Sequence, residues 1–334
     1  MNNLNVIVMI NGTTMDSWPV SMWSDLHLDR NHLYLNFLKT SNPILKKLFK
    51  LSFSNRINSK FSFTGKSFWS PLVSINKKAF SKSKKNILVF ESSVKFPPFL
   101  ISKIKKYWDC DVLLYLPDTV NSLGIATTKA QILKYQKEYH IDKIISFDPK
   151  DCCSFDFLYF DIFSSSFILD ILGNEQYFID CDLSYVGTKR SNDREMLINS
   201  IYTSSLLISN FKASLILIDK KSAINTIDSE LGFSNGLPYS EVIKKDIHSN
   251  CLLEIINPGQ TGCTFKMKEA IILNKKLLTN NISVKYLPFY NPNYIHIFND
   301  VSDIDFSWVK KKESVEYNYD NRFSPINLFS KLYK

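Results

Sequence analysis

The sequence predicts an α/β protein made of two Rossmann-like domains, on three observations. Its 334 residues are more than one typical core accommodates and suit two domains of ordinary size. Short β-rich runs alternate with helical patterns, which is the rhythm of parallel α/β architecture. The alternation forms two consecutive sets of similar length, so we expect one sheet with its helices in each half of the chain.

The first set of elements begins close to the N-terminus. Its strands are expected at Val6–Ile10, Ile87–Phe90, Val112–Leu116, Lys143–Phe147 and Leu158–Phe160. Helices are expected between them at Ile101–Trp108 and Thr128–Tyr139. These elements form the expected first domain, residues 1–172.

The second set follows the turn-prone Gly173-Asn174-Glu175. Its strands are expected at Leu183–Val186, Ser214–Ile218, Cys251–Ile256, Leu277–Thr279 and Tyr294–Ile297. Its helices are expected around Arg194–Phe211, Ser240–Asp246 and Phe265–Leu273. They form the expected second domain, residues 173–310. A last helix, Ile326–Tyr333, is expected within residues 311–334, because Ser324-Pro325 is a helix-start pair.

The segment Ser41–Phe80 interrupts the alternation. Asn42 followed by Pro43 predicts a helix start. Apolar residues then trace one helix face and lysines the other, namely Ile44, Leu45, Leu48, Phe49 and Ser52 opposite Lys46, Lys47 and Lys50. Such a basic amphipathic stretch suits a membrane interface, and it suits equally a core-facing helix with a solvated lysine face.

Composition excludes several classes of protein. Hydrophobic residues at 45% and charged residues at 22% give the balance of a soluble globular protein. No stretch approaches the roughly 20 apolar residues of a membrane-spanning helix, and the start lacks the features of a secretory signal. We therefore expect a cytoplasmic protein. The six cysteines form no C-x-x-C pair, which argues against a disulfide framework and a zinc site.

The net charge of +9 is unevenly distributed along the chain. Residues 1–85 hold 13 Lys and Arg against three Asp, a net of +10, so the remainder has a net of −1. A basic lobe beside a neutral one indicates that the first part of the chain faces an anionic partner. Nucleic acid, a membrane surface and a phosphorylated glycolipid all fit that description.

The richest chemical signal lies where the strand Cys251–Ile256 runs into a glycine-containing loop and then a helix. Glycines let the backbone approach a ligand, and free N–H groups at a helix start favour an anion. Lys266 lies about one turn into the helix and could reach a diphosphate, while Glu269 could accept hydrogen bonds from ribose hydroxyls. The same pattern also starts helices for purely structural reasons. The candidate ligand-binding residues here are Gln260, Thr261, Gly262, Thr264, Lys266 and Glu269.

A second candidate loop follows the strand Leu183–Val186. Gly187, Thr188, Lys189 and Arg190 combine a glycine turn with hydroxyl and cationic groups that suit a phosphate. Ligands bind open α/β sheets at the carboxyl ends of strands. Two such loops in one domain therefore predict a shared anion-binding site.

These segments carry a resemblance. Three segments are similar to the donor domain of GT-B glycosyltransferases from bacterial lipopolysaccharide and capsule clusters. They are Tyr185-Val-Gly187-Thr-Lys-Arg190 with Arg194, then Gly259-Gln-Thr-Gly262-Cys-Thr264-Phe-Lys266-Met-Lys-Glu269-Ala, and Lys275–Asn281. CgeB-type spore proteins are more distantly similar. That group commonly has arginine at the position of Lys266 and glycine at that of Asn274. Lysine in place of arginine keeps the positive charge but cannot make the two parallel hydrogen bonds of a guanidinium. Asparagine in place of glycine still tolerates the left-handed backbone conformation at the end of a helix.

The resemblance implies a GT-B fold, two Rossmann-like domains with a cleft between them. It implies a nucleotide-sugar donor on the second domain, a glycan or glycolipid acceptor on the first, and a last helix that returns to the first domain. The nucleotide-sugar would be a co-substrate, with no other cofactor and no metal. We then expect a cytoplasmic enzyme of surface polysaccharide biosynthesis, peripheral on the inner membrane through contact with anionic lipid, and no nucleic-acid partner.

Catalytic residues are less clearly marked in the sequence. An inverting transfer needs a carboxylate or histidine close to the acceptor hydroxyl, and GT-B enzymes supply it from loops of the first domain. Asp118 and Glu91 follow strands of that domain, and His27 lies in an aromatic-rich region. These three are the candidate catalytic residues.

Two alternatives stay open. Asp180-Cys181-Asp182 matches the D-x-D signature with which GT-A glycosyltransferases hold Mn²⁺ or Mg²⁺, although the same short pattern also occurs at Asp109–Asp111 and Asp303–Asp305. A non-catalytic protein that binds nucleic acid or a membrane would also explain the basic first lobe.

Overall fold

The computed structural model describes residues 3–9, 18–26, 40–52, 66–72, 77–91, 98–124, 128–176, 178–219, 230–234 and 236–333. The chain forms two compact units. Unit 1 comprises Met1–Phe163 with Ser324–Lys334, and unit 2 comprises Ser164–Phe323. The boundary expected at residue 172 lies within helix α9 (Phe167–Asn174) of unit 2. Within the described ranges, none of the helices has both the length and the apolar character to cross a membrane.

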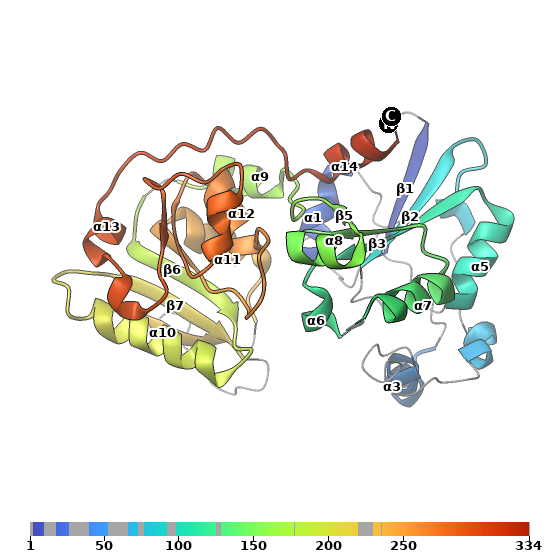
Figure 1. Ribbon diagram of the computed structural model, residues 1–334, viewed down its shortest axis with the longest axis horizontal. Coiled ribbons are helices and arrows are strands. Elements are labelled where there is room, and N and C mark those ends of the chain that lie inside the picture. The colour runs from blue at the N-terminus through green and yellow to red at the C-terminus, as the bar shows by residue number, and fades with distance from the viewer. Residues whose placement is uncertain are drawn as a thin grey trace. The chain divides into compact units, whose positions relative to one another are not determined.

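Unit 1 contains a parallel sheet whose described strands follow the order of the chain, β1-β2-β3-β4-β5 (Figure 1). The strands are β1 (Leu4–Met9), β2 (Lys85–Glu91), β3 (Cys110–Leu116), β4 (Lys143–Ser146) and β5 (Leu158–Tyr159). The helical segments are α1 (Trp18–Trp23), η1 (Ser24–Leu26), α3 (Pro43–Ser52), η2 (Lys66–Leu72), η3 (Lys77–Ala79), α5 (Pro98–Tyr107), α6 (Val120–Leu123), α7 (Lys129–Tyr139), α8 (Pro149–Phe155) and α14 (Pro325–Leu332).

Alternation along the central strands gives the sheet of unit 1 two buried faces. Leu88, Phe90 and Leu114 pack into a core with the apolar residues of α5 and α7. Tyr115, the next residue along β3, instead contacts the rings of Trp23 and Phe163. Because both faces are covered, the strands are apolar almost throughout, as expected for a parallel sheet.

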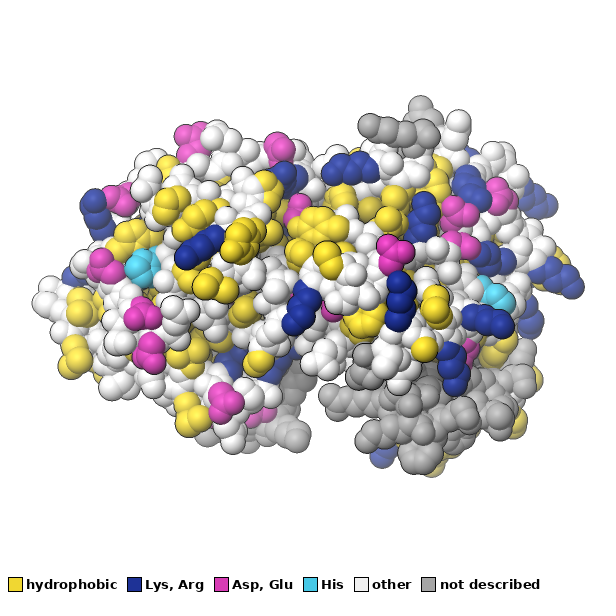
Figure 2. All heavy atoms as spheres, viewed as in Figure 1, with side chains coloured by type: hydrophobic (Ala, Val, Ile, Leu, Met, Phe, Trp, Pro, Cys, Tyr) yellow, Lys and Arg dark blue, Asp and Glu magenta, His cyan; other side chains and the backbone are white. Residues whose placement is uncertain are grey.

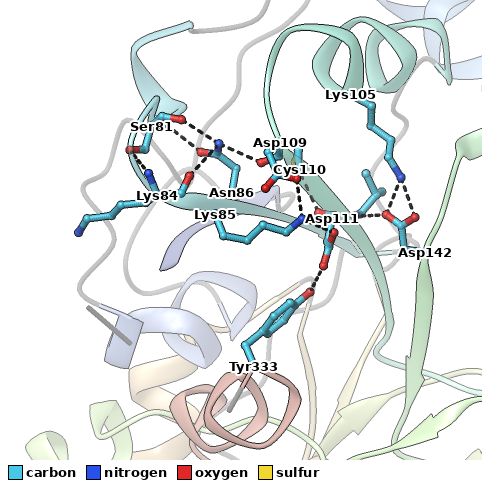
Figure 3. Close-up of polar contacts among 11 residues, drawn as sticks. Ser81, Lys84, Lys85, Asn86, Lys105, Asp109, Cys110, Asp111, Asp142 and Tyr333 are labelled. Carbon is cyan, nitrogen blue, oxygen red and sulfur yellow. Dashed lines mark hydrogen bonds and ion pairs between the residues drawn. The ribbon is translucent and has the colours of Figure 1, made fainter. Parts of the chain in front are cut away.

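The last segment of the chain packs on unit 1, at the amino end of β3 (Figure 3). Tyr333 donates a 2.9 Å hydrogen bond from its hydroxyl to Asp111 Oδ2. Lys85 Nζ pairs with Asp111 at 2.9 Å and with Asp109 at 2.6 Å. Ser324, at the start of α14, donates to Asp25 of η1 at 2.6 Å. These contacts bind both ends of α14 to unit 1.

Unit 2 contains a second parallel sheet in the order β11-β10-β9-β6-β7-β8. The strands are β6 (Cys181–Thr188), β7 (Ala213–Ile218), β8 (Leu231–Ser234), β9 (Ser249–Glu254), β10 (Lys276–Thr279) and β11 (Ile295–Ile297). Besides α9, the helical segments are α10 (Asn192–Ser205), α11 (Tyr239–Ile247), α12 (Phe265–Ile272), η4 (Ile282–Tyr286), η5 (Val301–Asp303) and α13 (Phe306–Lys310).

This strand order has a switch point at its centre. The chain moves outward from β6 through β7 to β8, then returns to β9 on the other side of β6 and moves outward through β10 to β11. That is the doubly wound Rossmann order, in which ligands bind at the carboxyl ends of the two central strands. The loops that leave β6 and β9 therefore occupy the position where a ligand is expected.

The predicted strands and helices have counterparts in the structure, but unit 2 also contains segments that were not expected, among them α9, α13 and β8. The helix expected to reach Phe211 ends at Ser205, and the chain turns through Asn210 at a φ of 53°. Strand β8 was not expected, because Leu231–Ser234 is only four residues long and contains a glycine. Short edge strands carry too little periodicity to be recognised from sequence.

Candidate functional site

The carboxyl end of β6 contains a glycine, Gly187, that the local packing requires. A Cβ atom at Gly187 would lie 2.2 Å from the hydroxyl oxygen of Tyr185, whose buried ring folds over this position. The following residues are more open: Thr188 and Arg190 are exposed, while Lys189 pairs with Glu195 of α10 at 2.6 Å. The hydrogen bond to Glu195 raises the pKa of Lys189, which keeps its ammonium charged. This segment thus presents a hydroxyl and two cations at the carboxyl end of β6.

Arg194, in the first turn of α10, connects the two candidate loops. Its Nη1 donates to the carbonyl of Thr188, the last residue of β6, at 3.2 Å. Its Nη2 donates to the carbonyl of Ile255 at 3.0 Å and to Asn257 Oδ1 at 2.9 Å, after β9. One guanidinium therefore holds both loops in register at the switch point. A planar fork with several donors suits this bridging role better than an ammonium.

The loop after β9 contains a tight turn that explains its first glycine. Gln260 N donates to the carbonyl of Asn257 at 3.1 Å, and Gly259 has a φ of 80°. Proline at the second position and a left-handed glycine at the third are the signature of a type II turn. Gln260 Oε1 accepts from Asn257 N at 3.3 Å, so this side chain closes the turn.

A buried carboxyl group holds the far end of the same loop. Glu254, the last residue of β9, is 1% exposed and accepts hydrogen bonds from the hydroxyls of Thr264 and Thr279. Thr264 is also the N-cap of α12 and accepts from Met267 N at 3.3 Å. Burial raises the pKa of Glu254 to about 7, against the opposing effect of the two threonine hydrogen bonds. The carboxyl group thereby orients the start of α12.

Lys266 and Glu269 lie in a buried ionic cluster between α11 and α12. Lys266 Nζ lies 2.7 Å from Asp246 Oδ2 and 2.9 Å from Glu269 Oε2, and the Glu269 contact is ionic rather than an aligned hydrogen bond. Tyr239 donates to Glu269 Oε1 at 2.8 Å. All four side chains are at most 10% exposed.

The cluster perturbs the acidity of its members. Burial raises the pKa of Asp246 to about 7, although Lys266 opposes this effect. Burial would also raise the pKa of Glu269, but the positive charge of Lys266 and Lys268 outweighs it and lowers that pKa. Burial would lower the pKa of Lys266, but the two carboxylates outweigh it and raise that pKa. A charged lysine between the carboxylates is therefore the stable state.

The ten predicted donor-binding residues thus lie in different surroundings within unit 2. Lys266, Glu269, Thr264 and Gln260 already make contacts within unit 2, while Gly187 is required by Tyr185. Thr188, Lys189 and Arg190 lie at the open carboxyl end of β6. Thr261 and Gly262 follow the turn, and Gly262 accepts from Asn281 Nδ2 at 3.3 Å through its carbonyl. Binding of a donor by any of these residues stays a prediction.

The candidate catalytic residues of unit 1 differ in accessibility. Glu91 is completely buried at the end of β2, and its Oε1 accepts from Trp23 Nε1 at 3.0 Å. Asp118 is partly exposed two residues after β3, and its Oδ1 accepts from Thr119 N at 2.9 Å. His27 lies outside the described residues. Asp118 is therefore the described candidate with access to solvent.

The three D-x-D copies have structural contacts. Asp182 Oδ2 accepts from Lys212 N at 2.9 Å at the amino end of β6, the edge opposite the candidate loops. Asp111 pairs with Lys85 and accepts from Tyr333 (Figure 3). Asp305 caps α13 by accepting from Ser307 N and Trp308 N. One aspartate of each copy therefore has a partner within the chain: Asp182 and Asp111 near the amino ends of strands, and Asp305 at a helix cap.

Comparison with known proteins gives a match in structure. No family model matches the chain, and no curated protein matches its sequence. Among solved structures, sucrose-phosphate synthase from Thermosynechococcus elongatus is similar with a TM-score of 0.50 at 10% identity, over 99% of this chain and 97% of that one. The chain has the GT-B fold, two Rossmann-like units. This confirms the fold class that the sequence predicted.

Several residues that shape the site were not among the predicted site residues. Asp246 and Tyr239 lie on a helix remote from the glycine loops in sequence, and only the packing of α11 on α12 brings them to Lys266. Glu254 had a sequence signal, because it is an acidic residue within the apolar run Cys251–Ile256. A buried carboxyl in a strand end is retained only where it has partners.

Proposed function

We propose that the protein is a glycosyltransferase that moves a sugar from a nucleotide-sugar donor to a glycan or glycolipid acceptor. One observation carries the proposal: the two loops at the switch point of the unit 2 sheet converge on Arg194. They combine the exposed Arg190 and the partly exposed Lys189, which pairs with Glu195, with the start of α12. Cations beside a helix start at a switch point are the arrangement that binds the diphosphate of a nucleotide.

The chemistry of a leaving nucleoside diphosphate explains the need for these groups. Negative charge grows on the diphosphate as the glycosidic bond to the donor breaks. Lys189, Arg190 and the N–H groups at the start of α12 would offset that charge without a cation. We therefore propose a metal-independent transfer, with the donor held by residues 187–190 and 260–264 of unit 2.

Unit 1 would hold the acceptor. Asp118 is our candidate for the base that removes the proton of the acceptor hydroxyl, since its carboxylate is partly exposed beyond the carboxyl end of β3. An anionic acceptor, such as a phosphorylated glycolipid of bacterial surface polysaccharide biosynthesis, fits the net charge of +10 in residues 1–85. The lipopolysaccharide or capsule context rests on the sequence resemblance.

The GT-A alternative has no support from the structure. Asp182 uses its carboxylate at the amino edge of the unit 2 sheet, whereas ligands of such sheets bind at the carboxyl edge.

Nucleotide binding tests the proposal directly. A thermal-shift screen with UDP, GDP, CDP, ADP, dTDP and CMP, and then their sugar conjugates, should raise Tm by several degrees for one nucleotide family. Replacing Lys189 and Arg190 together with alanine should weaken that ligand at least about tenfold, because charge-assisted hydrogen bonds are lost.

Lys212→Ala is the matched control, since this exposed lysine lies at the amino end of β7. It should leave nucleotide affinity unchanged. A screen without any stabilising nucleotide, or equal affinity in the double variant and the wild type, would overturn the donor-site assignment.

A further inference from the structure

Helix α3 presents apolar side chains on two separate faces. Phe49 is 3% exposed and meets the ring of Trp69 edge-on at 5.3 Å, and Leu45 packs against the same core. In contrast, Ile44, Leu48 and Leu51 are 68%, 48% and 45% exposed. The sequence had placed Ile44, Leu45, Leu48 and Phe49 on a single face. Leu45 and Phe49 therefore pack in the core, and Ile44 and Leu48 belong to an exposed surface.

The exposed residues form a stripe bordered by lysines. At about 100° per residue, Ile44, Leu48 and Leu51 lie within about 60° of one another around the helix axis. Around the helix from Leu51, Lys47, Lys50 and Lys46 follow in that order before Phe49 is reached, and all three are exposed. We call these six residues the α3 face. Its apolar stripe and basic border have the pattern of helices that lie in a bilayer interface.

A neighbouring aromatic ring adds to the exposed apolar surface. Phe68 of η2 is 72% exposed, and its ring meets that of Trp69 at 5.8 Å. Trp69 also contacts Phe49, so the buried side of α3 and the segment that carries Phe68 both pack against the ring of Trp69. On the face that Figure 2 shows, lysine and arginine side chains also occur on other parts of unit 1.

We propose that the α3 face docks on an anionic lipid bilayer. Ile44, Leu48 and Leu51 would enter the interface, while the lysines lie at the level of the lipid headgroups. The net charge of +10 in residues 1–85 strengthens attraction to anionic lipid within a Debye length, about 8 Å at physiological salt. Nucleic acid would satisfy the lysines and leave the apolar stripe in water, so lipid is the better match. The inference does not depend on the glycosyltransferase activity.

Vesicle sedimentation tests the proposal with the full chain. The wild type should sediment with vesicles of phosphatidylglycerol and phosphatidylcholine, not with phosphatidylcholine alone, and should dissociate as salt rises. A triple variant with Lys46, Lys47 and Lys50 changed to glutamate should lose on the order of a hundredfold in affinity. Leu48→Ser should lose roughly fivefold, because about half of a leucine side chain remains to be buried.

Helix α7 of the same unit supplies matched controls. Lys129, Lys134 and Lys137 are exposed there, and Leu133 is 58% exposed. Changing Lys129, Lys134 and Lys137 to glutamate reverses the same charge as the α3 triple variant, and Leu133→Ser removes the same side chain as Leu48→Ser. Both changes should reduce vesicle affinity much less than their α3 counterparts. Every variant should keep the wild-type Tm in the absence of vesicles.

Two outcomes would overturn the inference. One is equal loss in the α3 and α7 triple variants, which would mean that only overall charge matters. The other is tight binding of single-stranded RNA that displaces the vesicles, together with an unchanged vesicle affinity of Leu48→Ser.

Discussion

At the scale of one residue, Glu254 joins three segments of unit 2. It ends β9, and its carboxyl accepts from Thr264 at the start of α12 and from Thr279 at the end of β10. It has a pKa raised by burial to about 7. The group is thus more readily protonated in the folded chain than in the unfolded one, where a glutamate titrates near 4.5. The start of α12 depends on a group that titrates near neutral pH.

This shift has a definite sign in the pH dependence of stability. Between about pH 4.5 and 7 the folded state binds more protons than the unfolded state, so the free energy of unfolding falls as pH rises. Glu254→Gln removes that titration. The fall in the free energy of unfolding between about pH 4.5 and 7 should therefore shrink by ~3 kcal/mol. Urea unfolding at several pH values measures the difference from the wild type.

Glu241→Gln, on the exposed surface of α11, is the control and should keep the wild-type slope. Asp246 also has a pKa raised to about 7, so a residual slope is expected in both variants. Identical slopes in Glu254→Gln and the wild type would show that Glu254 is not buried in solution.

At the scale of elements, α11 and α12 are joined by the ions between them. Lys266 of α12 contacts Asp246 of α11 and Glu269 of its own helix, and Tyr239 reaches Glu269 from the start of α11. α12 also carries the helix start at which we expect the diphosphate. Lys266 accordingly positions, through packing, the loop at which we expect a donor, and direct contact with that donor would require it to leave two carboxylates.

Lys266→Ala should therefore destabilise the protein by about 3–5 kcal/mol at neutral pH, since it removes the cation that two buried carboxyls share. The loss should shrink towards acidic pH, where the carboxyls bind protons and no longer need the cation. Denaturant unfolding measures both effects. Lys285→Ala, an exposed lysine of η4, should change stability very little. A loss below ~1 kcal/mol for Lys266→Ala would mean that the cluster does not form.

At the scale of the whole molecule, charged residues are distributed differently in the two units. In unit 2, Asp246, Asp182 and Asp305 lie in a buried cluster, at a strand end and at a helix cap, while cations lie at the carboxyl end of β6. The first 85 residues carry the net positive charge. We expect the first arrangement to bind a nucleotide diphosphate without a metal and the second to attract an anionic partner.

Transfer activity should persist in excess EDTA, because cations and backbone N–H groups offset the charge of the diphosphate. The assay uses the sugar conjugate of the nucleotide that stabilises the protein, with release of that nucleotide as the readout. Activity that disappears with EDTA, returns with Mn²⁺ and is abolished by Asp182→Ala would contradict this expectation and favour the GT-A alternative.

The sequence by itself determined the local structure of this protein. Strands such as Cys110–Leu116 and helices such as Lys129–Tyr139 follow from periodicity, and Pro258-Gly259 marks its own turn. These features depend on neighbours within a few residues, so the sequence displays them directly. The two glycine loops were recognised for the same reason.

Only the tertiary structure decided which charged residues are buried. Lys266 and Glu269 have the spacing of ligand-binding residues. In the structure, however, Lys266 pairs with Asp246 and Glu269 accepts from Tyr239, and both partners come from a different helix. Arg194 likewise acquires its role when β9 returns to the side of β6. Strand order and helix packing bring together residues that are far apart in sequence, such as Arg194 and Asn257, which are 63 positions apart. Sequence periodicity reports which face of an element is buried, whereas the partner on that face is set by the fold.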